Sequence, residues 1–85
     1  MNKLKIVIVE WVDSSFSEGW VGEDKFDYGI CRIHSVGYLV HETKEFISIA
    51  LNVGDNGQIS DVMNIPKAAL LSMTELKLEN KIMQK

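Results

Sequence analysis

The chain has 85 residues, of which 46% are hydrophobic and 25% are charged, and its formal net charge is -3. This length predicts one domain that buries only about 60 to 65 per cent of its unfolded surface. We therefore expect a homo-oligomer, in which contacts between subunits bury part of the remaining apolar surface. The 12 acidic residues outnumber the 9 basic ones, which argues against a protein that binds long nucleic acids through their phosphates.

Cysteine usage and the N-terminal sequence both favour the cytoplasm. Cys31 is the single cysteine, so no internal disulfide is possible. The apolar run over residues 6–9 stops at Glu10, which is too short for a signal-peptide core and far too short to cross a bilayer. The sequence therefore predicts no membrane partner.

The opening segment predicts a strand followed by a long loop. Residues 4–12 are rich in β-branched side chains and apolar on both faces, as in a strand inside a closed sheet or under a neighbouring subunit. Residues 14–28 show no period and combine glycines, acids and aromatics, which is typical of an irregular loop with its own packing. Such a loop is usually functional or an extended connection, and one alternative is that Trp20 and Phe26 simply pin it to the end of a barrel.

A β-hairpin over residues 36–52 organises the rest of the chain. A four-residue loop over residues 42–45 predicts that His41 lies opposite Phe46 and that Val36 lies opposite Leu51. One face of this hairpin is apolar and is expected to form core; it carries Val36, Tyr38, Val40, Ile47, Ile49 and Leu51.

The remaining elements complete a mainly β fold. A second strand starts near Tyr28, and the sequence does not determine its pairing register. Gly37 is expected where this strand bends or closely approaches another backbone. An Asn-Gly turn within residues 54–57 precedes a strand over 59–65, a single helical turn over 67–69 and a strand over 70–78. A C-terminal helix is the alternative for the last segment, because Leu71, Leu78 and Ile82 have partly helical spacing.

This order of elements predicts a small five-stranded SH3-like or Sm-like barrel with a long first loop. The barrel is expected to span residues 1–78, followed by a charged tail over residues 79–85.

Six residues are candidates for a ligand site. Aromatic faces with neighbouring hydroxyl and carboxylate groups suit a base and a ribose, and a basic pair on one strand face suits a phosphate. The candidates are Trp11, Asp13, Ser15, Trp20, Arg32 and His34. The alternative is that both tryptophans are core or interface anchors and that the basic pair lies on a solvated strand face.

Motifs for catalysis and metal binding are missing from the sequence. It has no nucleophile elbow and no phosphate-cradling glycine loop, and Cys31 and His34 project from opposite faces of a strand. Glu10 lies within an apolar strand, where a salt bridge or a strand end explains it better than a general acid. We therefore expect neither an enzyme nor a protein that holds a metal or cofactor.

Several short motifs resemble small accessory proteins encoded by bacteriophages. These motifs are W-x-D in the opening strand, G-W in the loop, S-V-G-Y-L in the central strand and I-P-K-A-A-L-L-S-M-T-E-L near the end. The resemblance covers about Trp11 to Leu76 and implies a protein made in the cytoplasm of an infected host bacterium.

By analogy with phage proteins of this size, the expected function is non-enzymatic sequestration of a nucleotide-type immune signal of the host by a homo-oligomer. The alternative is a protein-binding module that inhibits or redirects a host protein.

Overall fold

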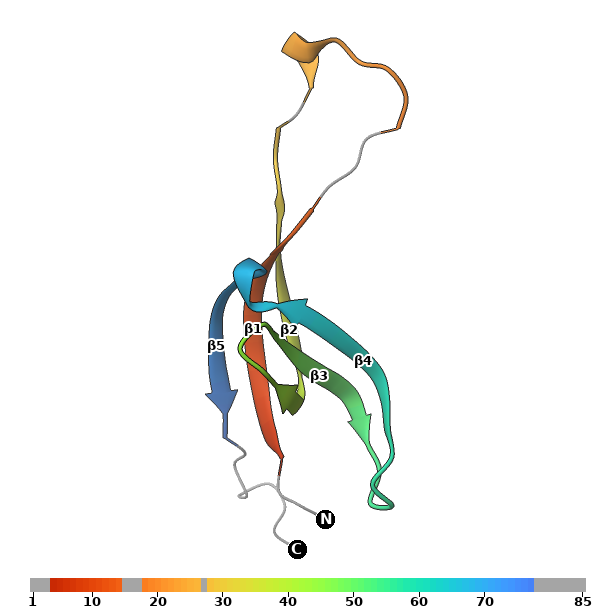
Figure 1. Ribbon diagram of the computed structural model, residues 1–85, viewed down its shortest axis with the longest axis vertical. Helices are drawn as coiled ribbons and strands as arrows, with labels where there is room; N and C mark the ends of the chain where they lie inside the picture. The colour runs from red at the N-terminus through yellow and green to blue at the C-terminus, as the bar shows by residue number, and fades with distance from the viewer. Residues whose placement is uncertain (1–3, 15–17, 27, 78–85) are drawn as a thin grey trace, which may run out of the picture.

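Over the residues that the structure describes, the fold is a five-stranded antiparallel sheet with almost no helix, which confirms the mainly β prediction (Figure 1). The computed structural model describes residues 4–14, 18–26 and 28–77. In chain order the elements are β1 (Lys5–Asp13), the 3-10 turn η1 (Glu23–Lys25), β2 (Cys31–Glu42), β3 (Phe46–Val53), β4 (Ile59–Pro66), the 3-10 turn η2 (Lys67–Ala69) and β5 (Leu70–Leu76).

The strands lie in the order β4-β3-β2-β1-β5, so the sheet is open, with β4 and β5 at its two edges. β2 begins three residues later than its predicted start near Tyr28. The last predicted strand is a strand as far as Leu76, so the alternative of a helix is wrong for this part; the tail over residues 79–85 lies outside the described residues.

The core lies on one face of this sheet, which we call the inner face. β1 is central, between β2 and β5, and its alternation places Val7 and Val9 on the inner face, where both are fully buried. Ile6 and Ile8 lie on the opposite, outer face and are only half-buried. The buried core cluster consists of Val7, Val9, Ile47, Ile49 and Ile65, with Trp11, Leu39 and Leu70 packed against it.

The central hairpin forms as predicted, but its register was wrong. Tyr38 lies opposite Ala50 rather than Ile49, and a bulge between Leu39 and His41 shifts the pairing further, so that Glu42 lies opposite Ile47. Thr43 closes the loop: its backbone N–H donates to the carbonyl of Phe46 at 2.9 Å.

The corrected register changes which hairpin residues are buried. Ile47 and Ile49 are buried as expected, whereas Val36 and Leu51 are 51% and 63% exposed and are not core. Both residues lie beyond the last β2–β3 pair, where the two strands have parted.

Gly37 marks the point where β2 and β3 part. A Cβ at this position would lie 2.9 Å from the carbonyl oxygen of Ala50, so the predicted close backbone approach is confirmed. On the N-terminal side of Gly37, β2 pairs only with β1 among the described residues, while β3 continues with β4. Beyond this glycine the sheet therefore divides into two branches, β3 with β4 on one side and β2 with β1 and β5 on the other.

The predicted turns between β3 and β4 and between β4 and β5 are also present. Gly57 has a φ of +88°, and its N–H donates to the carbonyl of Gly54 at 3.0 Å, which gives the tight Asn-Gly turn. η2 lies against the β2–β3 loop, since the N–H of Lys67 donates to the carbonyl of Glu45 at 2.8 Å. The Lys67 Nζ atom lies 2.9 Å from Glu42 Oε2, and this hydrogen bond and charge lower the pKa of the Glu42 carboxyl.

The loop between β1 and β2 projects from the sheet instead of folding onto it (Figure 1). Its described residues are 18–26 and 28–30, and we call them the arm. The arm gives the molecule extents of 61 × 27 × 22 Å and a radius of gyration of 17.4 Å. A compact chain of this length would have a radius of gyration of about 12 Å. The alternative that Trp20 pins the loop to the end of a barrel is therefore wrong.

Candidate functional site

The base of the arm is a ribbon made by the end of β1 and the start of β2, and it is two-stranded beyond the last β1–β5 pair at Trp11. Its pairing extends to Asp13 opposite Cys31. Trp11 and Asp13 project from the inner face of this ribbon, because they alternate with Glu10 and Val12. Trp11 packs against the core cluster, and its Nε1 donates to Ser35 Oγ at 3.1 Å. The Trp11 indole therefore packs as an anchor of the core, which agrees with the alternative that the tryptophans are core or interface anchors.

The outer face of the same ribbon carries a small group of charged side chains. Arg32 Nη1 lies 3.4 Å from Glu10 Oε2, and His34 Nε2 lies 3.9 Å from the same oxygen. The predicted shared face of Arg32 and His34 is confirmed, and so is the salt-bridge explanation of Glu10. Both basic side chains are more than half exposed, so the pairs are weak and the guanidinium retains donors for an anionic ligand.

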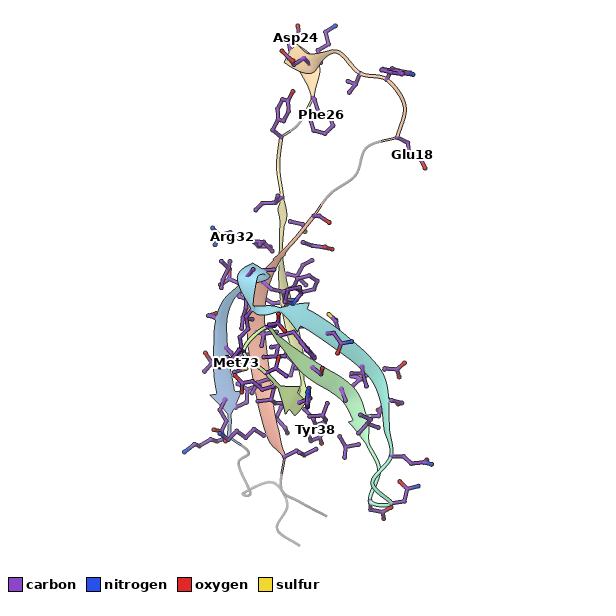
Figure 2. The ribbon with its side chains drawn as sticks, in the orientation of Figure 1. Glu18, Asp24, Phe26, Arg32, Tyr38 and Met73 are labelled. Atoms are coloured by element: carbon purple, nitrogen blue, oxygen red, sulfur yellow. The ribbon has the colours of Figure 1, made fainter. Side chains whose placement is uncertain are left out.

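The arm presents apolar side chains to solvent. Trp20 is fully exposed (105% of its reference area), and Tyr28 and Ile30 are 73% and 66% exposed. Local contacts give the tip its shape: the rings of Phe26 and Tyr28 meet edge to face at 4.8 Å, and the Tyr28 hydroxyl donates to the carbonyl of Glu23 at 3.1 Å. Figure 2 shows Phe26 and Asp24 at this tip, well away from Tyr38 and Met73 in the sheet.

The six predicted ligand residues are thus not brought together within one chain. Trp11 and Asp13 lie on the inner face, Arg32 and His34 lie on the outer face, and Trp20 lies on the arm. Ser15 lies outside the described residues. A site that uses these groups jointly needs a second molecule, and ligand binding by these residues stays a prediction.

The structure adds a hollow that the sequence did not reveal. Where β2 and β3 part, the space between them has a volume of about 360 Å³, and we call this hollow the wedge. It is lined by Ser35, Val36, Ile49, Ala50, Leu51, Asp61 and Met63. Gly37 was the sequence signal for this place, since it permits the close β2–β3 approach next to which the strands separate.

Asp61 is the charged group of the wedge, and its backbone is unusual. Its φ of +56° is in the left-handed region, which non-glycine residues rarely adopt. The side chain is held by Asn52, whose Nδ2 donates to Asp61 Oδ2 at 3.1 Å. A carboxylate accepts more hydrogen bonds than this, so Asp61 offers acceptor capacity to an incoming donor.

Comparisons with known proteins give no relative from which to transfer a function. No protein-family model matches this chain, and neither the curated proteins nor the solved structures contain a match to it. In the described part of the chain, no three His, Cys, Asp or Glu side chains gather where they would hold a metal ion. The same residues include no helix long and apolar enough to cross a membrane. The fold and site define a small open-sheet β protein with a projecting aromatic arm.

Proposed function

We propose that this protein is a non-enzymatic protein-interaction module whose recognition element is the arm. The observation that carries the proposal is the complete exposure of Trp20 on a segment that stands away from its own sheet. Tryptophan and tyrosine are the residues most enriched at the energetic centres of protein interfaces. Val21, Tyr28 and Ile30 extend the exposed apolar surface along the arm. The resemblance to phage accessory proteins adds support for a role in a host bacterial cytoplasm.

The experiment is site-specific photo-crosslinking in the cells that produce the protein. A photoreactive amino acid replaces Val21, which is 51% exposed and adjacent to Trp20. We expect a covalent adduct with a protein, identified by mass spectrometry, that disappears when Trp20→Ala is added. A matched probe at Leu71, which is 49% exposed on β5, controls for random collisions. Adducts that are the same with and without Trp20, or no protein adduct, would contradict the proposal.

A second candidate function is sequestration of a nucleotide-type signal at a site shared between subunits. It is favoured by the free stacking face of Trp20 and by the exposed guanidinium of Arg32 beside His34. One base stacked on an aromatic side chain is worth about 1 to 3 kcal/mol, so Trp20→Ala should weaken binding roughly five- to 150-fold. Calorimetry against cyclic dinucleotides and ADP-ribose derivatives, with both proteins, tests this function. Absence of binding to the whole panel would leave the protein-binding function.

We also propose that the open sheet has the arrangement of an SH3-like or Sm-like barrel. The strand order β4-β3-β2-β1-β5 and the 3-10 turn η2 between β4 and β5 support an SH3-like or Sm-like arrangement. In such a barrel the two edge strands curl towards each other around the inner face. The inner face already holds the buried cluster, which supports curvature in this direction.

A further inference from the structure

We infer that the arm of one copy of this protein docks into the wedge of a second copy, with Trp20 as the anchor. The inference rests on the proposed function of the arm and names its partner as a second copy related by a twofold axis. Each copy then supplies one arm and one wedge, so both arms and both wedges are covered in a closed dimer.

The arm is held away from the wedge of its own chain. β1 and β2 remain hydrogen-bonded up to Asp13 and Cys31, so a paired ribbon leads from the sheet towards the arm. Figure 2 shows the consequence: Glu18, Asp24 and Phe26 stand beyond the end of the sheet, on the far side of Arg32 from Tyr38. A second chain supplies an arm to the wedge without breaking this ribbon.

The wedge has the chemistry that an indole and an extended backbone require. Val36, Leu51 and Met63 provide exposed apolar surface, and Asp61 provides an acceptor for the indole N–H. The edge of β2 that faces the wedge has no strand partner over its first half among the described residues. This edge offers backbone donors and acceptors to an added strand.

The exposed aromatic side chains of the arm are large enough for the contact that we infer. Trp20 and Tyr28 each bury on the order of 150 to 250 Å² when covered. If both side chains were fully covered and the receiving surfaces lost an equal area, the two contacts would bury about 1,600 Å² in total, within the roughly 1,200 to 2,000 Å² of a standard protein interface. The predicted homo-oligomer and the exposed apolar surface of Leu51 and Val36 are explained by the same contact.

Sedimentation velocity with two complementary variants tests the inference. Trp20→Ala removes the anchor and leaves the wedge, whereas Leu51→Glu places a charge in the wedge and leaves the arm. Each should weaken dimer formation at least about 30-fold relative to the wild type, as expected for the loss of an anchor at an interface. Both residues are exposed within the chain, so the thermal unfolding of the monomer should change little.

Mixing separates this contact from other modes of assembly. Alone, the Trp20→Ala variant and the Leu51→Glu variant should each stay monomeric. At the same total concentration their equimolar mixture should form dimers, because the intact arm of Leu51→Glu can bind the intact wedge of Trp20→Ala. Leu71→Glu, on β5 outside the wedge, should dimerise as the wild type does. A wild type that stays monomeric at high micromolar concentration, variants that dimerise normally, or a mixture that stays monomeric would overturn the inference. An arm-dependent crosslink to a different protein, with a monomeric wild type, would overturn this inference and retain the proposed function.

Discussion

Gly37 shows at the level of a single residue how the sequence sets the shape of the sheet. Its missing side chain admits the carbonyl oxygen of Ala50, which a Cβ would meet at 2.9 Å. We expect Gly37→Ala to lower the free energy of unfolding by about 1 to 3 kcal/mol, since the contacted atom is backbone and the strands must shift. Urea denaturation measures the change. Gly22→Ala is the control, because its Cβ would meet only the mobile side chain of Asp24, and it should be nearly neutral. Equal losses in both variants would contradict the role of Gly37.

Asp61 is the second residue at which backbone conformation determines the outcome of a substitution. A left-handed backbone costs a non-glycine residue roughly 1 to 2 kcal/mol, least for Asp and Asn and most for β-branched residues. With its φ of +56°, Asp61 should accept Asn or Gly with little loss, whereas Asp61→Val should lower stability by at least about 1 kcal/mol. Thermal melts of the three variants rank them. A Val variant as stable as the Asn variant would show that the backbone is free to leave this conformation.

At the level of elements, η2 is connected to the central hairpin by an ion pair that responds to pH. Lys67 lowers the pKa of Glu42 in the folded protein below its usual value of 4.5, by hydrogen bonding and by charge. The stabilisation is therefore fully present above the unfolded pKa and is lost as the pH falls through the folded pKa. Glu42→Gln should flatten the acid limb of a plot of melting temperature against pH. Glu75→Gln serves as the control, and an acid limb unchanged by Glu42→Gln would sink this prediction.

The elements also show which structural features the sequence could predict. The β-branched runs, the Asn-Gly turn and Pro66 were sufficient to predict the sequence of strands along the chain and the helical turn at η2. The hairpin register was not predictable, because residues 46–51 are apolar or small at nearly every position and accept either alternation, and nothing in the sequence marks the bulge before His41. Strand alternation correctly placed Arg32 and His34 together, because they lie on one paired element. The position of Trp20 depends on the exit direction of the arm, which local patterns do not encode.

At the scale of the whole molecule, the absence of turnover is a prediction that follows from the sequence. The two basic side chains near the arm, Arg32 and His34, are mostly exposed and share one carboxylate partner, Glu10. We expect cyclic dinucleotides and ADP-ribose derivatives to be recovered chemically unchanged after incubation with the protein and denaturation. Chromatography of the nucleotides measures this directly. Cleaved products that vanish in a Glu10→Gln variant would instead establish an enzyme.

The shape of the single chain is the property on which both proposals for the arm depend. The arm extends beyond the ribbon of β1 and β2, and the radius of gyration is 17.4 Å, against about 12 Å for a compact chain of this length. Small-angle scattering from the Trp20→Ala variant, which should be monomeric, is therefore expected to give a value near the larger of these two. The Leu51→Glu monomer should agree with it, because its wedge is blocked by a different change. If both monomers scatter as compact particles, the arm folds back onto its own sheet and is not held out for a second molecule, which would contradict both proposals.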